Sequence, residues 1–111
     1  MKYRLTRYQD AQGHVPFSRW LNGLRDLKAV AQILLRLNRA AEGYLGDRNH
    51  LRDGVWEMRL HSGPGYRLYY GFSGREKLLL LNGGDKSSQQ SDINKAISYW
   101  QDQQLRKHHE K

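Results

Sequence analysis

The apolar residues of this chain change their spacing at Val55, and this change limits the folds that the chain can adopt. Between residues 16 and 41 they recur every three or four residues, the period of an amphipathic helix. From Val55 onward they alternate with polar residues, the period of a strand with one buried face. Helices and then strands are therefore expected, and the chain is predicted to form an α+β fold.

The helical part is predicted to be a hairpin of two helices. Pro16 suits the first position of a helix because that position needs no N–H partner. The apolar face of this helix is expected to contain Phe17, Trp20, Leu21 and Leu24. Asp26 is a suitable N-cap for the second helix, which is expected to end before Gly43. The apolar stripe predicted for it comprises Leu27, Val30, Ile33 or Leu34, Leu37 and Ala41.

The predicted sheet has four strands and is rich in antiparallel pairs. Residues 3–8 alternate polar and apolar side chains and are predicted to form the first strand. Residues 47–54 are polar and are expected to form a loop. Three further strands, joined by turns that contain glycine, are expected at residues 55–61, 66–72 and 77–81.

A last helix is expected after the glycines that end the third of these strands. Ser91 is its predicted N-cap, and its apolar face comprises Ile93, Ala96, Ile97 and Trp100. The element order is therefore β-α-α-β-β-β-α. Residues 1–104 are predicted to form a single domain, and the basic residues 105–111 are expected to fray.

The chain is strongly basic, which indicates a partner that carries negative charge. Its 111 residues include 19 Lys and Arg against 11 Asp and Glu, a formal net charge of +8. Such a field attracts phosphate backbones or an acidic protein, although simple solubility is an alternative explanation. No cysteine is present, which excludes disulfides and thiolate zinc sites, and the histidines lack metal-ligand spacing. Neither a metal nor a cofactor is therefore expected.

The first residues contain no long apolar run, so neither a signal peptide nor a membrane anchor is predicted. We therefore expect a cytoplasmic protein without a membrane partner. The absence of cysteine suits such a reducing compartment.

Polar side chains are predicted to cluster on one face of the sheet. If the apolar residues of both strands face the core, Arg67 must share the opposite face with Glu57, Arg59 and His61. A shift of one residue in the strand pairing would bury Arg67 in the core. The last strand is expected to end close to this face. The candidate site residues are Glu57, Arg59, His61, Arg67, Asp85 and Lys86.

These residue types fit the cleavage of a phosphodiester bond. Cations bind phosphate oxygens and stabilise the charge of a pentacoordinate phosphorane, a role open to Arg59, Arg67 and Lys86. Glu57 and His61 are titratable groups that could act as base or acid. The alternative is an ordinary solvated sheet face on which Glu57 neutralises a neighbouring arginine.

Three segments resemble the RelE/ParE/HigB-like toxins of toxin–antitoxin modules, in particular the phage-derived Gp49-like subgroup. They are DGVWEMRLHSGPGYRLYYG from Asp53 to Gly71, LLLLNGGDKSSQ from Leu78 to Gln89, and DINKAISYW from Asp92 to Trp100. The resemblance extends over nearly the whole chain. It implies a RelE-like fold, in which an antiparallel sheet packs against a helical hairpin and a C-terminal helix.

The resemblance also implies a function and partners. The expected activity is that of a ribosome-dependent, metal-independent endoribonuclease that cuts mRNA and inhibits translation. The expected partners are a cognate helix-turn-helix antitoxin, mRNA on the ribosome, and operator DNA through the antitoxin complex. Arg67 and Lys86 correspond to family residues that contact mRNA, and Arg59 corresponds to another if one residue is gapped in the turn before Tyr66.

One family residue has no counterpart in this chain. RelE uses a tyrosine near the start of the last helix, where Asp92 or Ile93 stands here. Another group, His61, Glu57 or Asp85, would then transfer the proton, and HigB-type toxins do use His and Asp. Two other functions remain open: a ParE-like, non-catalytic poison of DNA gyrase, and an inactive module that binds only antitoxin and operator DNA.

Overall fold

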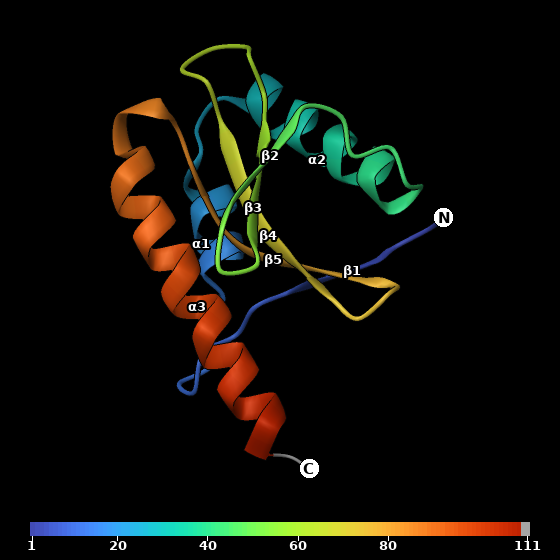
Figure 1. Cartoon of the computed structure of the whole chain (residues 1–111). Helices are drawn as coiled ribbons and strands as arrows, with labels where there is room; N and C mark the ends of the chain where they lie inside the picture. The colour runs from blue at the N-terminus through green and yellow to red at the C-terminus, as the bar shows by residue number, and fades with distance from the viewer. Residues whose placement is uncertain (110–111) are drawn as a thin grey trace.

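The computed structural model describes residues 1–109, and it confirms an α+β fold in which helices cover a central sheet (Figure 1). The strands are β1 (Arg4–Arg7), β2 (Arg48–Arg52), β3 (Val55–Arg59), β4 (Arg67–Ser73) and β5 (Lys77–Gly84). The helices are α1 (Pro16–Gly23), α2 (Leu27–Ala41), the short 3-10 helix η1 (Lys86–Ser88) and α3 (Gln89–His109).

The sheet has five strands and not four. Their order is β1-β5-β4-β3-β2, with β1 parallel to β5 and all other pairs antiparallel. The additional strand is β2, in the segment predicted to be a loop. Its sequence, RNHLR, lacks the alternation of apolar residues by which a strand is recognised, and its side chains are exposed or half-buried in the structure. The sequence signal for it was Asp53-Gly54, whose positive φ angles of 55° and 87° suit a tight hairpin turn.

The helical hairpin forms as predicted, and α2 buries part of the expected apolar stripe. Asp26 caps α2 by accepting hydrogen bonds from the N–H groups of Lys28 and Ala29, at 3.0 and 3.3 Å. Leu27, expected in the core, is 79% exposed, and Leu34 is exposed too. Ile33 and Leu37 are buried as predicted, and Ala29 and Ala40 are buried beside them.

Arg36 connects α2 to the end of the sheet. Its guanidinium donates hydrogen bonds to the carbonyls of Arg59, Leu45 and Asp47, at 2.8, 3.1 and 2.7 Å. Arg36 thus points toward the end of the sheet. The two buried alanines of α2, Ala29 and Ala40, belong to the same buried core as Met58 and Leu68 of the sheet.

Both faces of the sheet are covered, so the fold has three layers. The hairpin packs on one face, where Met58, Leu68, Tyr70 and Leu80 are buried. The other face, which carries the predicted polar side chains, is covered by α3, to the left of the strands in Figure 1. The residues buried there are Tyr8, Val55, Tyr69, Leu79, Leu81, Ala96 and Ile97.

The helix α3 begins earlier and extends further than predicted. Its entry is η1, capped by Asp85, whose carboxylate accepts a hydrogen bond of 2.8 Å from the N–H of Ser87. Ser91 lies within the helix and not at its cap. At the other end, residues 105–109 are helical where fraying was expected, because Lys107 donates to Ser73 Oγ at 2.7 Å and Arg106 lies 3.1 Å from Asp102. Residues 110 and 111 lie outside the described part. No helix within residues 1–109 has the length and apolar character needed to span a membrane.

Gly71 tests the packing of α3 on the sheet. A Cβ atom at Gly71 would overlap the ring of Trp100, whereas one at Gly23 would meet no atom within 4 Å. Gly71→Ala is therefore expected to lower the free energy of unfolding by about 1 to 3 kcal/mol through overpacking. Gly23→Ala is the matched control and should change it by less than about 1 kcal/mol. Urea unfolding followed by circular dichroism measures both, and equal stability of the two variants would contradict this packing.

Candidate functional site

Strand pairing brings the predicted arginines together. Arg59 on β3 lies directly opposite Arg67 on β4, and Arg67 lies opposite Gly84 on β5. This pairing puts both arginines on one face of the sheet, as the sequence predicts. Glu57 lies two residues before Arg59 and so shares its face. The ends of β3, β4 and β5 therefore place two cations and one carboxylate beside the turn that leads into η1.

Glu57 is the centre of this group, and it is fully buried. Its carboxylate accepts a hydrogen bond of 2.9 Å from Arg59 Nε and one of 3.1 Å from Gln89 Nε2. Arg67 Nε lies 4.0 Å from the same carboxylate. We call Glu57, Arg59, Arg67 and Gln89 the ion cluster. With its carboxylate held by these three side chains and only 1% of its side chain exposed, Glu57 is placed to orient the arginines rather than to take a proton from a substrate.

Arg67 is buried but incompletely hydrogen-bonded. Its side chain is 7% exposed, and its Nη1 makes long hydrogen bonds of 3.4 and 3.3 Å to the carbonyls of Gly65 and Tyr66. Its Nε has no hydrogen-bond partner among the described residues. Burying a guanidinium with an unused donor costs free energy, and such groups are typical of functional sites.

Lys86 lies at the same end of the sheet as Arg67. Its side chain passes over Gly65, where an added Cβ atom would lie 3.2 Å from Lys86 Cγ. Lys86 itself is exposed. The neighbouring Asp85 has a structural contact, since its carboxylate accepts hydrogen bonds from Ser87 Oγ and N, at 2.5 and 2.8 Å. These hydrogen bonds hold the pKa of Asp85 below its ordinary value.

His61 does not join the ion cluster. It lies beyond the end of β3, is exposed, and is paired with the carboxylate of Asp47. Among the described residues no hydrogen bond or ion pair connects it to Glu57, Arg67 or Lys86. The hydrogen bond from His61 is the main cause that holds the pKa of Asp47 below its usual range. This His–Asp pair was not predicted, because it joins residues that are 14 positions apart in the chain.

Arg59 connects the two groups. Its side chain binds Glu57, and it also lines a hollow of about 300 Å³ together with Asp47 and His61. The site is therefore a strip at one end of the sheet, running from His61 past Arg59 to Arg67. Cations along such a strip can grip a phosphate, and the exposed imidazole can exchange a proton. Among the side chains that the structure describes, no group of three or more acidic or histidine residues is arranged to hold a metal ion.

The ion cluster makes a prediction about stability. Glu57→Gln removes the carboxylate beside the buried Arg67 and should lower the free energy of unfolding by about 3 to 5 kcal/mol, as expected when one partner of a buried ion pair is lost. Glu76→Gln is the control, because it changes the net charge equally at an exposed residue. If urea unfolds the two variants at the same concentration, Glu57 does not hold the arginines.

Comparison with known proteins identifies the family of this chain. The model of the family described as phage derived protein Gp49-like matches residues 19–99, which include the whole ion cluster. An uncharacterized protein of Haemophilus influenzae is 41% identical over 80 residues, which cover 72% of this chain and 81% of that protein. The chain therefore belongs to the phage-derived Gp49-like family, a family of RelE-type toxins.

Proposed function

We propose that this toxin is an endoribonuclease that cuts mRNA on the ribosome and so inhibits translation. The observation that carries the proposal is the grouping of three cations at one end of the sheet, where Arg67 lies opposite Arg59 and the side chain of Lys86 passes over Gly65. Preorganised cations at a solvent-accessible edge suit the charge that develops on a phosphate during cleavage. The net charge of +8 supports an RNA partner as well.

The proposed reaction uses the 2′-hydroxyl of the RNA itself. A base removes the 2′-hydroxyl proton, the 2′-oxygen attacks the adjacent phosphorus, and the bond to the 5′-oxygen breaks. A proton delivered to that 5′-oxygen completes the step, which yields a 2′,3′-cyclic phosphate and a 5′-hydroxyl. Arg59, Arg67 and Lys86 stabilise the phosphorane, and no step in this scheme requires a metal ion.

His61 is the side chain best placed to transfer a proton in this reaction. It is 72% exposed, and Asp47 fixes the orientation of its ring. An imidazole can act as base or acid near neutral pH. Glu57 and Asp85, the other two candidates, have carboxylates already bound by Arg59 and by Ser87, respectively. We therefore propose that His61 transfers a proton in this reaction, as the base at the 2′-hydroxyl or as the acid at the 5′-oxygen.

A cognate antitoxin is the partner that the family suggests. We extend the proposal to mRNA on the ribosome as the substrate complex, and to operator DNA bound through the antitoxin. The exposed cations of the strip offer a surface that an acidic antitoxin segment would cover.

Lys86 provides the cleanest test of the site, because it is exposed and its loss should leave the fold intact. Lys86→Ala is expected to slow single-turnover cleavage of mRNA on programmed ribosomes by about 10²- to 10³-fold. Arg67→Lys, which keeps a positive charge near Glu57, should slow cleavage through loss of the bidentate grip. Lys28→Ala, an exposed change on α2, is the control and should cleave normally. A folded Lys86→Ala protein with the wild-type rate would place the site elsewhere.

The chemistry can be tested on the substrate. Replacing the 2′-hydroxyl at the scissile nucleotide with hydrogen should abolish cleavage, while binding of the substituted mRNA should change little. The unsubstituted product should carry a 5′-hydroxyl, detected by its ready labelling with polynucleotide kinase. His61→Ala should lower the cleavage rate more than mRNA binding, because His61 is proposed to move a proton. Cleavage of the deoxy substrate, or products with 5′-phosphates, would contradict this mechanism.

A further inference from the structure

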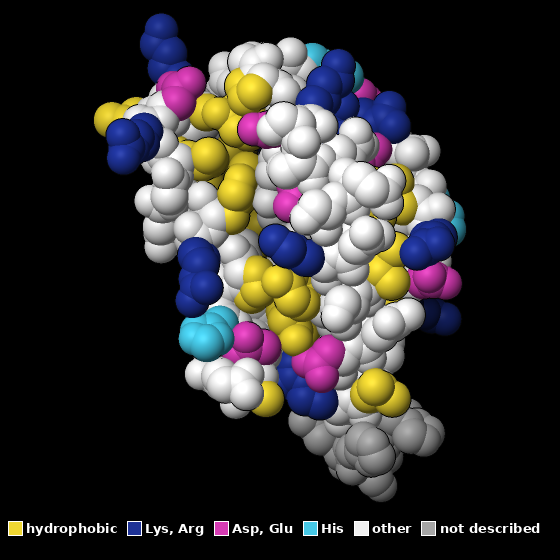
Figure 2. Space-filling view, turned by 90° about the vertical axis from the view of Figure 1, so that its left-hand side faces the viewer, with side chains coloured by type: hydrophobic (Ala, Val, Ile, Leu, Met, Phe, Trp, Pro, Cys, Tyr) yellow, Lys and Arg dark blue, Asp and Glu magenta, His cyan; other side chains and the backbone are white. Residues whose placement is uncertain are grey.

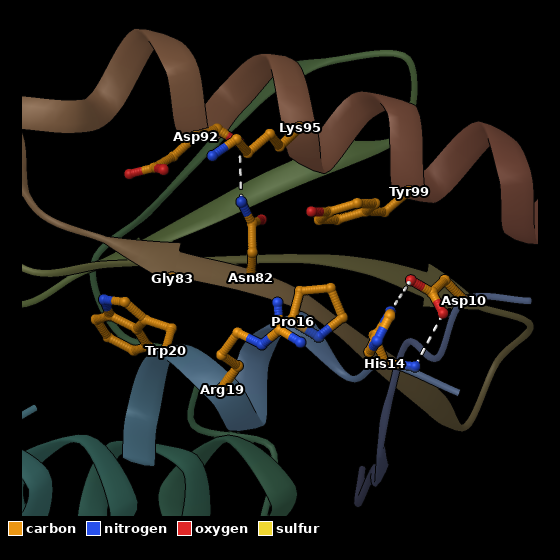
Figure 3. Close-up of a pocket in the computed structure, with 10 residues that line it drawn as sticks. All are labelled: Asp10, His14, Pro16, Arg19, Trp20, Asn82, Gly83, Asp92, Lys95 and Tyr99. Atoms are coloured by element: carbon orange, nitrogen blue, oxygen red, sulfur yellow. Dashed lines mark hydrogen bonds and ion pairs between the residues drawn. The ribbon is translucent and has the colours of Figure 1, made fainter. Parts of the chain in front are cut away.

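A second hollow lies apart from the strip, between α1 and α3. The strand β1 pairs with β5 only as far as Leu80, so the following residues of β5 form the floor of an open groove of about 330 Å³. Figure 2 shows the face that carries α1 and α3, with hydrophobic side chains exposed along its centre and charged ones around them. The floor, walls and mouth of the groove include Asn82, Gly83, Trp20, Tyr99, Arg19 and Lys95 (Figure 3).

The two aromatic walls are held in place from behind. Trp20 lies close against β5 because Gly83 has no Cβ atom, which would overlap the indole ring. The edge of Tyr66 supports the same ring, with 6.1 Å between ring centroids. On the other side, Tyr99 stacks on Tyr8 at 4.9 Å and an interplanar angle of 18°. Trp20 and Tyr99 are only half-buried, so both rings keep surface open toward the groove.

Asn82 supplies a hydrogen-bond acceptor that nothing uses. It is 5% exposed, and its Nδ2 donates a hydrogen bond of 3.0 Å to the carbonyl of Asp92, which fixes the orientation of the carboxamide. Its Oδ1 has no partner among the described residues and points toward Tyr99 in Figure 3. An unpaired buried acceptor is costly, so a ligand that donates a hydrogen bond there would be favoured.

Two exposed cations at the mouth of the groove offer contacts to an anionic ligand. Arg19 and Lys95 are exposed, and neither forms an ion pair within the described residues. The two carboxylates nearby are already bound. Asp10 accepts hydrogen bonds from the backbone of Gln12 and His14, and Asp92 accepts one of 2.5 Å from Ser88 Oγ.

We infer that this groove binds one unstacked nucleotide of single-stranded RNA. The base contacts Trp20 and Tyr99, an N–H of its edge donates to Asn82 Oδ1, and the phosphate meets Arg19 and Lys95. Stacking of a base on an aromatic side chain is worth about 1 to 3 kcal/mol. A volume of about 330 Å³ lies at the lower end of the range for small-ligand sites, which suits one nucleotide rather than two.

This inference rests on the proposed function, since it assigns the groove to a nucleotide near the one that is cut. The two sites are neighbours in the fold. Gly84, which pairs with Arg67 in the strip, lies directly against the side chain of Asp92, which lines the groove. An RNA strand bound along the strip can therefore place a flanking base in the groove.

Binding of mononucleotides to the free full-length protein tests the groove without the ribosome. In ¹⁵N-labelled protein, AMP is expected to shift the indole N–H signal of Trp20 and the side-chain amide signal of Asn82 in a saturable way. The indole signals of Trp56 and Trp100 are internal controls and should not move. Adenosine and ribose 5-phosphate should each bind more weakly than AMP, because each lacks one half of the contacts.

Two variants and two controls sharpen the test. Arg19→Ala and Lys95→Ala should each raise the Kd for AMP by about five-fold, whereas Arg25→Ala and Lys28→Ala, exposed cations outside the groove, should not. The inference is overturned if the shifts appear only around Arg67 and Lys86, or if ribose 5-phosphate binds as tightly as AMP. Cleavage of mRNA without nucleotide binding in the groove would overturn this inference alone. Binding in the groove by a protein that never cuts RNA would overturn only the proposed function.

Discussion

The buried carboxylate of Glu57 is the interaction on which the rest of the structure depends. It permits two arginines to lie opposite each other on β3 and β4, where like charges alone would be unfavourable. It also accepts a hydrogen bond from Gln89 in the first turn of α3, which fixes the start of that helix over the sheet. A buried ion group of this kind contributes little net stability, but it holds charges in one defined arrangement. That arrangement is what a phosphate-binding site requires.

The periodicity of the sequence was sufficient to predict which side chains share each face of β3 and β4. Alternation placed Met58 and Leu68 on one face and Arg59 and Arg67 on the other, as observed. It could not show that the charged face would be buried, because burial of charge depends on partners from other elements. The strand β2 was missed for a related reason, since an edge strand needs backbone partners but no apolar side chains.

The cations of the candidate site could be predicted from the sequence, but the side chains that contact the site could not. Arg59, Arg67 and Lys86 occur in a recognisable pattern along the chain. Gln89 and Asp47 do not, because their contacts with Glu57 and His61 join residues separated by 32 and 14 positions. The predicted polar face is only partly exposed in the structure: Glu57 is buried, whereas His61 is open to solvent. One face of a strand thus supplies both the support of the site and its accessible groups.

The central claim is that this family member acts on RNA through the strip of cations at the end of the sheet. Mapping of all mRNA 5′ ends after brief induction, with gyrase-linked DNA breaks measured in the same cells, tests it most directly. The account predicts new 5′-hydroxyl ends within translated regions of mRNA, and no excess of gyrase-linked breaks. Unchanged mRNA ends together with gyrase trapped on DNA would contradict it and would assign the chain to the gyrase poisons of the same fold.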